Sequence, residues 1–374
     1  MQHVVRGRGS LNGANISALL EALSVQKPLL VCGRRMAQTL RERVGMSLPI
    51  FSGYHPNPDL ADCEAGAAMY RDMGCDGLIS LGGGSAMDTA KAIKALLLTG
   101  DMEAVRRSDL PSDTWLPHIA VPGTAGTGAE ATPIAVVYVN DGKLSLDHPA
   151  LLPEAVVLDS SLLDTLPDYH RKACAMDALA QGIESFWARK ATPESRVHAE
   201  QAIRGVLKNL NAYLTGEPDA QDALLTAAFE SGCAIRISRT TAAHAMSYQL
   251  TKRLGYAHGH ACMLTLPCLW VHLHLGGQAA QVLTALAKAM DLSDPALVPG
   301  VLTGMLAALD MLPAALPDDA TLDVLAASVN TQRLGNHPEP LTAEELRKVY
   351  VRSLTPLDEA ARDTALALWR QYGA

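Results

Sequence analysis

The stretch from Leu78 to Ile93 constrains the fold more than any other part of the sequence. It reads LISLGGGSAMDTAKAI, so an apolar strand runs into three glycines and then into a helical pattern. Glycines at such a junction let backbone N–H groups approach a diphosphate, and the helix N-terminus adds the positive end of its dipole. The phosphate-binding candidates are therefore Gly82, Gly83, Gly84 and Ser85. Taken alone, the run also fits a plain tight turn in which Ser85 is the N-cap of the following helix.

A second glycine-rich element, PGTAGTGAEAT, extends from Pro122 to Thr132 and also follows an apolar strand. It offers backbone amides and the hydroxyls of Thr124 and Thr127 to a ligand. Two such loops in one α/β half predict a dinucleotide across the edge of a sheet. The alternative for this loop is a connector of small residues with no ligand.

The end of the first strand bears on the choice of dinucleotide. Many NAD sites place an acidic residue there, on the adenosine ribose, whereas this chain reads VCGRR from Val31 to Arg35. Gly33 leaves no carboxylate to repel a 2′-phosphate, and the guanidinium groups of Arg34 and Arg35 can pair with one. We therefore expect NADPH to be preferred over NADH. Otherwise both arginines are solvated charges on the next helix.

The spacing of apolar residues predicts two domains. Short apolar segments at 28–32, 78–81 and 118–121 alternate with helical patterns, which is typical of a mostly parallel α/β sheet. After Pro167 the chain is rich in Ala and Leu at helical spacing, over 171–190, 194–213, 221–254 and 278–290. We expect an NAD(P)-binding α/β domain over residues 1–165 and an all-helical, metal-binding domain over residues 166–374.

Composition excludes several classes of protein. The 374 residues include 31 basic and 39 acidic side chains, for a formal charge of −8, and 48% are hydrophobic. This hydrophobic content excludes a disordered chain, and the acidic balance argues against nucleic acid as a partner. No apolar stretch resembles a secretory signal or reaches the ~18 residues of a membrane span. We expect a cytoplasmic protein without membrane partners.

The cysteines are scattered and contain no C-x-x-C pair. This spacing argues against a disulfide framework and against a thiolate zinc site. We expect reduced, mostly buried packing residues at Cys32, Cys63, Cys75, Cys174, Cys233, Cys262 and Cys268.

Candidate metal ligands lie in the helical half. Asp177 and Gln181 are spaced i, i+4, so both project from one face of a helix. His244 and His258 follow, and imidazole is a common ligand for divalent first-row metals. A lone histidine on such a helix is otherwise a core residue, and a lone aspartate a charge on the helix face.

Helical spacing also predicts that Arg236, Thr240, His244 and Tyr248 form one stripe along a single helix. Cations along a substrate cleft favour an anionic substrate tail, since guanidinium groups pair well with phosphate and carboxylate. Arg239 and Arg253 are close in sequence. Solvated or interface arginines are the alternative for each of them.

Several motifs in order, GGGSxxDxAK, AGTGxExT, LLPxxVxLD, MDAL and HAM…HG, resemble the iron-dependent (group III) alcohol dehydrogenases. The resemblance runs from about residue 28 to 260, with a weaker tail at 333–342. It implies a two-domain fold similar to dehydroquinate synthase, with NAD(P) in the N-terminal half and a divalent metal in the cleft. Asp88 in the first motif joins the cofactor candidates, and a homodimer is compatible with the family.

The resemblance assigns metal ligation to Asp177, His244 and His258, with Gln181 in place of the family's first histidine. Gln181 either ligates through its weaker oxygen donor or leaves a water in its place. Iron(II) is the expected metal, with zinc as the alternative. Tyr248 replaces a histidine of many relatives and can relay a proton or bind the substrate oxygen, although its pKa of ~10 makes it a poor base. Its alternative role is packing.

The segments TTAAHAMSY, KLSLDHPxLLP and RLGN look more specifically like phosphonoacetaldehyde reductases of phosphonate metabolism, and Lys143 becomes a candidate cofactor or phosphate contact. We expect hydride transfer between nicotinamide C4 and a small aldehyde, with phosphonoacetaldehyde reduced to 2-hydroxyethylphosphonate. One alternative is a metal-independent reductase of the superfamily that takes a carboxylated substrate. The other is a catalytically silent nucleotide-binding protein.

Overall fold

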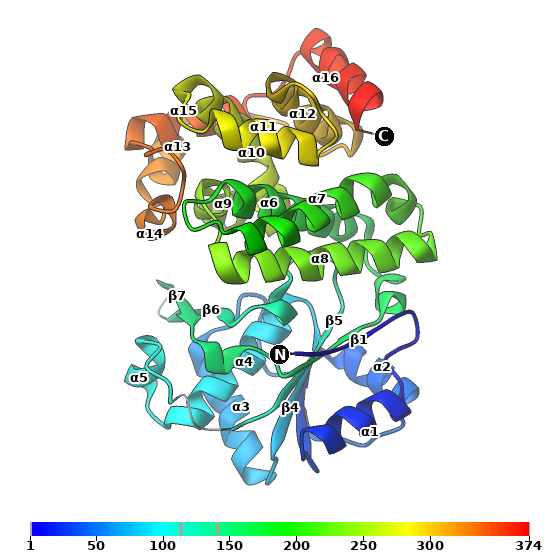
Figure 1. Cartoon of the computed structure of the whole chain (residues 1–374). Helices are drawn as coiled ribbons and strands as arrows, with labels where there is room; N and C mark the ends of the chain where they lie inside the picture. Colours follow the sequence, from blue (N-terminus) through cyan, green and yellow to red (C-terminus); the bar gives the residue numbers. More distant parts are fainter. Residues whose placement is uncertain (1, 112–114, 140–141, 374) are drawn as a thin grey trace. The chain divides into compact units, whose positions relative to one another are not determined.

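The computed structural model describes residues 2–111, 115–139 and 142–373. The chain divides into two compact units between Leu166 and Pro167, one residue beyond the boundary expected from the sequence. The first unit is α/β and the second is helical (Figure 1), which confirms the predicted fold class.

A six-stranded sheet forms the centre of the first unit, and all its described pairings are parallel. The strand order is β1-β8-β5-β4-β2-β3. The strands are β1 (His3–Arg6), β2 (Pro28–Cys32), β3 (Ile50–Phe51), β4 (Gly77–Gly82), β5 (His118–Pro122) and β8 (Ala155–Leu158). The helices are α1 (Gly13–Ala22), α2 (Arg34–Val44), α3 (Leu60–Asp72), α4 (Gly84–Thr99) and α5 (Met102–Arg106).

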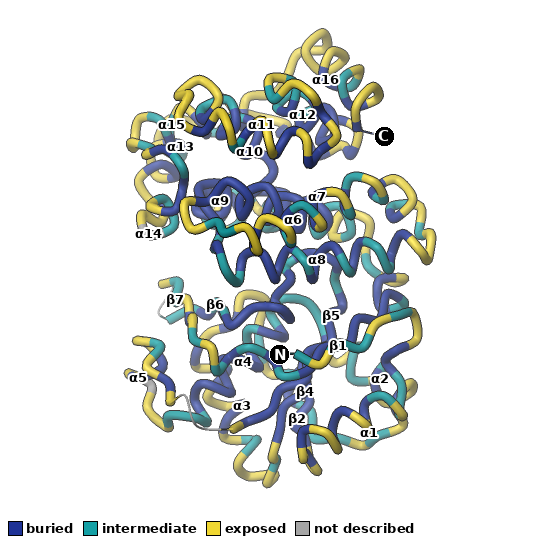
Figure 2. The backbone as a smooth tube through the Cα atoms, viewed as in Figure 1, coloured by how far each residue is buried: buried dark blue, intermediate teal, exposed yellow. Residues whose placement is uncertain are grey.

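Helices cover both faces of this sheet, which explains why its strands read as continuous apolar runs. β2 and β5 are buried along their whole length (Figure 2). Along β2, Leu29 and Val31 belong to the core that contains residues of α3 and α4. Leu30 and Cys32 point the other way, into the core that contains residues of α1 and α2.

A hairpin of β6 (Ile134–Val139) and β7 (Gly142–Asp147) forms a separate antiparallel pair. Lys143 lies on β7 opposite Tyr138. Short 3₁₀ turns complete the unit at Ala129–Ala131, Pro149–Leu151 and Ser160–Leu163.

Described helices of the second unit are bounded as follows. The first group is α6 (Asp168–Trp187), α7 (Pro193–Leu214), α8 (Pro218–Ser238), α9 (Ala242–Leu254) and α10 (His258–Gly276). The second is α11 (Ala280–Ala289), α12 (Val298–Ala308), α13 (Asp319–Ala327), α14 (Thr331–Leu334), α15 (Ala343–Leu354) and α16 (Glu359–Tyr372), with a 3₁₀ turn at Pro295–Leu297.

Helix α6 lies in the interior of this unit. It packs against α7, α8, α9, α10 and α11, and every residue from Ala175 to Trp187 is buried. Three of the buried residues carry a carboxylate or an amide, namely Asp177, Gln181 and Glu184. Buried polar groups need partners, so these side chains dictate polar contacts from the helices around α6.

The structure corrects the predicted single helix over 221–254. The helix α8 ends at Ser238, Arg239 has a φ of +63°, and α9 begins at Ala242 after Thr241 as its N-cap. Asn336 Nδ2 stabilises this break by donating to the carbonyl oxygens of Ser238 and Thr240. The expected stripe from Arg236 to Tyr248 is therefore wrong, because its members lie on different elements.

Among the described residues, no helix is both long and apolar enough to cross a membrane. The seven cysteines are free thiols. Cys32, Cys63, Cys233 and Cys262 are buried, and Cys75, Cys174 and Cys268 are half-buried.

Candidate functional site

The glycine loops of the first unit follow neighbouring strands. Gly33 comes after β2, Gly83 after β4 and Gly123 after β5, and these three strands are adjacent and parallel. Their carboxyl ends therefore share one edge of the sheet, which is where dinucleotides bind in open α/β sheets.

The two glycine-rich loops pack against each other. Gly123 N donates to Gly82 O at 2.7 Å. A Cβ on Gly83 would lie 3.4 Å from Thr124 Cγ2, and one on Gly84 would lie 3.3 Å from Thr127 Cγ2. Thr124 and Thr127, the two threonines expected to contact the cofactor, thus lie against the start of α4. They approach it closely because Gly83 and Gly84 have no side chains.

Ser85 does not cap α4. The N-cap is Gly83, and Ser85 Oγ accepts a hydrogen bond from Asn57 N at 3.3 Å instead. Because glycine carries no capping group, the first amides of α4 keep the orphan donors that bind anions at helix N-termini. This arrangement favours the phosphate-binding interpretation over the tight turn with a serine cap.

The lysine of the GGGSxxDxAK motif, Lys91 on α4, has a structural role. Lys91 is fully buried, and its Nζ donates to Ala129 O at 2.6 Å and to Ile134 O at 2.8 Å, which ties α4 to the segment after the second glycine loop. Burial lowers the pKa of Lys91 to about 8, and the negative charge of Asp88 opposes this shift.

Gly33 is exposed and is the N-cap of α2, with a φ of −67° and no heavy atom within 4 Å of a built Cβ. Neither space nor backbone conformation therefore requires glycine here. Arg34 and Arg35 are exposed on the first turn of α2.

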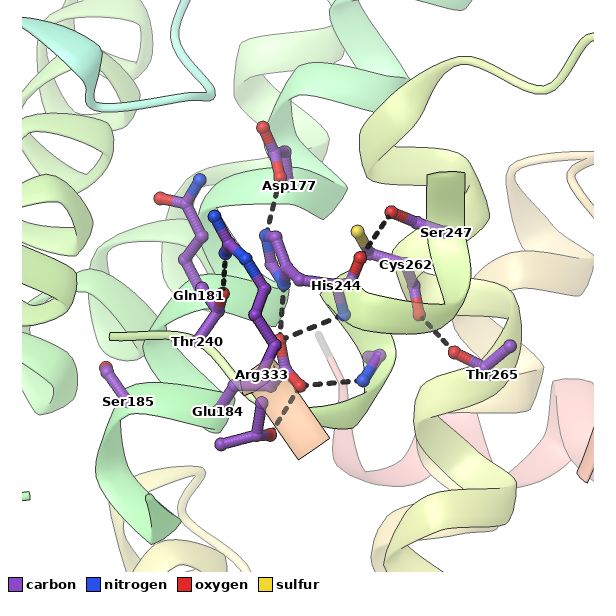
Figure 3. A network of polar contacts seen from close by, with 12 residues as sticks. Asp177, Gln181, Glu184, Ser185, Thr240, His244, Ser247, Cys262, Thr265 and Arg333 are labelled. Atoms are coloured by element: carbon purple, nitrogen blue, oxygen red, sulfur yellow. Dashed lines mark hydrogen bonds and ion pairs between the residues drawn. The ribbon is translucent and has the colours of Figure 1, made fainter. Parts of the chain in front are cut away.

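In the second unit, Asp177, His244 and His258 converge from three helices, α6, α9 and α10. Figure 3 shows Asp177 and His244 facing each other. Asp177 Oδ1 lies 3.3 Å from His244 Nε2 and 3.9 Å from His258 Nε2. Asp177 and His244 are buried, and the side chain of His258 is 38% exposed. The sequence prediction named all three residues.

Glu184 fixes the orientation of His244. Its carboxylate accepts hydrogen bonds from His244 Nδ1 and, at 2.8 Å and 3.3 Å, from the backbone amides of Ala243 and His244. Thr241 Oγ1 donates to the same carboxylate. Glu184 therefore caps the N-terminus of α9 and leaves the lone pair of His244 on Nε2, facing Asp177.

Ser247 does the same for His258. Its hydroxyl donates to His244 O at 2.9 Å, so its oxygen accepts from His258 Nδ1 at 3.2 Å. The lone pair of His258 is then on Nε2, which is the nitrogen that faces Asp177. Outer partners that set the tautomer in this way are the usual companions of metal-ligating histidines.

The polar atoms at the centre of this group fit a divalent metal ion. Asp177 Oδ1 and His244 Nε2 are buried and have no hydrogen-bond partner among the described residues. Burial raises the pKa of Asp177, but the charges of His258 and His244 and its hydrogen bonds bring it below the ordinary range. An ionised carboxylate and imidazole nitrogens in a buried site are the donors that divalent first-row metals prefer.

Cys262 joins this group, which the sequence analysis did not anticipate. It follows His258 by one turn of α10, and its Sγ lies 3.9 Å from His258 Nε2. One ligand atom from each of Asp177, His244, His258 and Cys262 lies within 4.8 Å of all the others. Burial raises the pKa of the Cys262 thiol, but His244 and His258 outweigh it and lower the pKa to about 7.

Gln181 is buried beside the group, but its amide oxygen accepts a hydrogen bond from Ser231 Oγ at 2.8 Å. The amide also hydrogen-bonds to Asp177, which helps to lower the pKa of that carboxyl. In Figure 3 the amide nitrogen is on the side of Asp177 and the oxygen is turned away.

Tyr248 stacks on His258, with ring centroids 6.1 Å apart and an interplanar angle of 5°. The guanidinium carbon of Arg333, on α14, lies 5.8 Å from the centroid of the Tyr248 ring, and Arg333 Nη1 donates to Thr240 Oγ1. Burial raises the pKa of Tyr248, and Arg333 opposes this shift. The phenol is therefore protonated at neutral pH.

The three arginines singled out in the sequence lie on or just after α8 and α9. Arg236 is half-buried in the last turn of α8, Arg239 Nη1 donates to carbonyl oxygens of the same helix, and Arg253 donates to Gln249 at 3.0 Å. The structure places a different cation, Arg333 of the RLGN segment, beside Tyr248.

Gly259 has a packing role that explains the HG pair. A Cβ at this position would lie 2.1 Å from Ala173 O and 2.5 Å from Asp177 Cβ. Only glycine lets the first turn of α10 approach α6 closely enough to place His258 beside Asp177.

Glu184 could have been found from sequence by its spacing. It is i+7 from Asp177 and i+3 from Gln181, so the three polar residues of an Ala-rich helix share one face. Cys262 offered a weaker signal, an i+4 spacing from His258.

Comparison with known families agrees with this geometry. The family described as "Iron-containing alcohol dehydrogenase" matches residues 2–160, and the one described as "Fe-containing alcohol dehydrogenase family, C-terminal" matches residues 172–308. The chain is also similar to a sulfoacetaldehyde reductase from Bifidobacterium kashiwanohense, solved in complex with NAD+, with 26% identity, a TM-score of 0.86 and coverage of 96% of this chain and 98% of that one.

Two curated relatives match shorter stretches. A phosphonoacetaldehyde reductase from Streptomyces viridochromogenes is 40% identical over 59% of this chain and 59% of its own length. A probable alcohol dehydrogenase from Escherichia coli is 34% identical over 56% of this chain and 54% of its own length. The matches thus span somewhat over half of these relatives. From the family matches in both units, the chain belongs to the iron-containing alcohol dehydrogenase family.

Proposed function

We propose that this chain is an aldehyde reductase that uses NADPH and a divalent metal held by Asp177, His244 and His258. The observation that carries the proposal is the pair of buried atoms Asp177 Oδ1 and His244 Nε2, which face each other at 3.3 Å and form no hydrogen bond within the described parts of the chain. Family membership supports the reaction type. Iron(II) is the metal we test first, with zinc as the alternative.

A divalent ion at this site supplies a Lewis acid that stabilises the negative charge developing on the carbonyl oxygen. The protein residues orient the metal-binding imidazoles and supply the proton for the product hydroxyl. Glu184 and Ser247 keep both imidazoles turned toward Asp177. Tyr248, whose burial keeps its phenol protonated, is the proposed donor of the proton that completes the product hydroxyl after hydride reaches the carbonyl carbon.

We further propose that the aldehyde carries an anionic tail. Relatives named for phosphonoacetaldehyde and sulfoacetaldehyde support this class of substrate, since both names denote a small aldehyde with a charged tetrahedral group. Arg333 supports it on the chain's side, because its guanidinium lies beside Tyr248. Guanidinium pairs well with phosphonate and sulfonate oxygens. Arg236 is retained as a second, weaker candidate.

The proposed cofactor contacts are the loops after β2, β4 and β5. Exposed Gly33 and Arg34 support NADPH over NADH, because no carboxylate at position 33 opposes a 2′-phosphate. The remaining proposed contacts are Gly82, Gly83, Gly84, Ser85, Asp88, Thr124, Thr127 and Lys143.

The test is the initial rate of NADPH and NADH oxidation by anaerobically iron(II)-loaded protein. Phosphonoacetaldehyde and an uncharged aldehyde of similar size serve as substrates. We expect faster turnover with NADPH and the phosphonate, and loss of the substrate preference in Arg333→Met. Equal rates on both aldehydes would contradict the proposed preference for an anionic tail. Full activity without metal would favour a metal-independent reductase.

A further inference from the structure

We propose that Cys262 is a ligand of the metal, so that the donor set is Asp177, His244, His258 and Cys262, and that Gln181 stays outside it. This inference rests on the proposed metal centre and changes its composition. It departs from the expectation that the cysteines only pack and that Gln181, or a water in its place, occupies the fourth position.

The distances between donor atoms carry the proposal. Four ligands about 2.0–2.3 Å from a tetrahedral ion are separated from one another by about 3.3–3.8 Å. The measured separations are 3.3 Å for His244 Nε2 to Asp177 Oδ1, 3.9 Å for His258 Nε2 to Asp177 Oδ1, and 3.9 Å for Cys262 Sγ to His258 Nε2. All four atoms lie within 4.8 Å of one another, a limit about 1 Å beyond the longest separation expected between tetrahedral ligands.

The fold aims the Cys262 side chain at this point. His258 and Cys262 are i and i+4 on the first turns of α10, so both project from the face that Gly259 holds against α6. Cys262 is fully buried. Asp177 Oδ1 on α6 and His244 Nε2 on α9, which have no hydrogen-bond partner in the described structure, face the same place independently of the cysteine.

The charge of the donor favours the thiolate over the amide. A Cys262 thiolate adds a second anionic ligand beside Asp177, and it attracts a divalent cation more strongly than the neutral amide of Gln181 does. Binding the ion transfers the Sγ proton of Cys262 to the buffer as the metal–sulfur bond forms, and no electron is exchanged.

Gln181 has another role in this arrangement. Its oxygen accepts from Ser231 Oγ, and its amide hydrogen-bonds to Asp177. Residues that hold a ligating carboxylate in this way typically change metal affinity by about 10- to 100-fold when they are removed. A thiolate among the donors favours zinc over harder cations such as magnesium or manganese.

X-ray absorption of the zinc-loaded wild-type protein tests the proposal without any variant. We expect one sulfur at about 2.3 Å from zinc, together with nitrogen and oxygen ligands at about 2.0–2.1 Å. A first shell of nitrogen and oxygen alone would overturn the assignment of Cys262. Because that result still records a bound metal, it leaves the proposed reductase function standing; absence of bound metal would contradict both.

Cobalt substitution identifies the cysteine. One equivalent of Co²⁺ should produce a thiolate-to-cobalt charge-transfer band in the near ultraviolet, and Cys262→Ser should abolish it. The matched control is Cys233→Ser, because Cys233 lies in a second group of donor side chains with His198 and Glu230. The band should persist in that control and in Gln181→Ala.

Zinc affinity distinguishes the role of Cys262 as a ligand from the role of Gln181 as an outer hydrogen-bond partner. Gln181→Ala should weaken zinc binding within about 10- to 100-fold, as an outer hydrogen-bond partner does, and Cys262→Ser should weaken it further. Circular dichroism and thermal unfolding confirm that each variant is folded. A band that is lost in Cys233→Ser but kept in Cys262→Ser would overturn the proposal.

Discussion

Glu184→Gln is the substitution that most sharply tests how the protein prepares His244. Glutamine keeps the size of the side chain but has one acceptor where the carboxylate has two. If its amide nitrogen occupies the Oε2 position, it faces His244 Nδ1 and forces the imidazole proton onto Nε2, the atom that faces Asp177. If the amide nitrogen takes the Oε1 position, it opposes the Ala243 amide and the Thr241 hydroxyl.

Both orientations of the glutamine amide weaken metal binding. The first puts the proton of His244 on the nitrogen that would bind the metal, and the second removes the hydrogen bonds that cap the N-terminus of α9. Loss of such an outer partner lowers metal affinity by about 10- to 100-fold, which corresponds to about 1.4–2.7 kcal/mol. We expect this loss in a zinc competition titration against a colorimetric chelator, with a parallel loss of aldehyde reduction at limiting metal.

The matched control is Glu230→Gln, which alters another Glu–His pair of the same unit, the half-buried pair of Glu230 Oε2 and His198 Nδ1 at 2.6 Å. It should leave aldehyde reduction unchanged. The reasoning about His244 is refuted if folded Glu184→Gln binds zinc at this centre as tightly as the wild type does.

Three further substitutions test other parts of the structure. Gly33→Asp places a carboxylate near the proposed 2′-phosphate, and two such charges 4 Å apart in water repel by about 1 kcal/mol. The NADPH/NADH ratio of kcat/KM should therefore fall at least about fivefold. An unchanged ratio would mean that the adenosine ribose binds elsewhere. Gly259→Ala forces α10 away from α6, so it should lower the free energy of unfolding by about 1–3 kcal/mol and weaken zinc binding. The control Gly33→Ala should do neither. Equal stability of the two variants would contradict the close approach of α10 to α6. Burial raises the pKa of Asp159, but hydrogen bonds from Ser161, Gly9 and Leu11 bring it below the ordinary range. The ionised Asp159 therefore stabilises the fold at pH values above the pKa that it has in the unfolded chain, and this stabilisation is lost as the pH falls through the pKa of the folded state. Asp159→Asn should therefore be less stable at pH 7 and lose less stability in acid, and parallel urea-unfolding curves across pH would argue against this linkage.

Features with a local cause were predictable from the sequence. The runs 28–32, 78–81 and 118–121 are apolar because both faces of a parallel sheet are covered, and the glycines that follow them mark the edge that we propose binds the cofactor. Asp177, His244 and His258 were recognisable because imidazole and carboxylate groups in known motifs narrow the chemistry that a site can perform.

Features with a nonlocal cause were not predictable. No glycine or proline marks the break between α8 and α9; it depends on Glu184, 57 residues before Thr241, and on Asn336, 96 residues after Thr240. Arg333 and Cys262 look ordinary in the sequence, and only the packing of α14 on α9 and of α10 on α6 gives them neighbours of chemical interest.

The most direct test of the central claim compares wild-type protein with His258→Ala, both loaded anaerobically with iron(II). Bound metal per chain and aldehyde-dependent NADPH oxidation are measured on the same samples. We predict one bound ion at this centre and turnover for the wild type, and loss of both in the variant, because the site loses one of its strong ligands. Full turnover by His258→Ala without bound metal would contradict a reduction that depends on this centre.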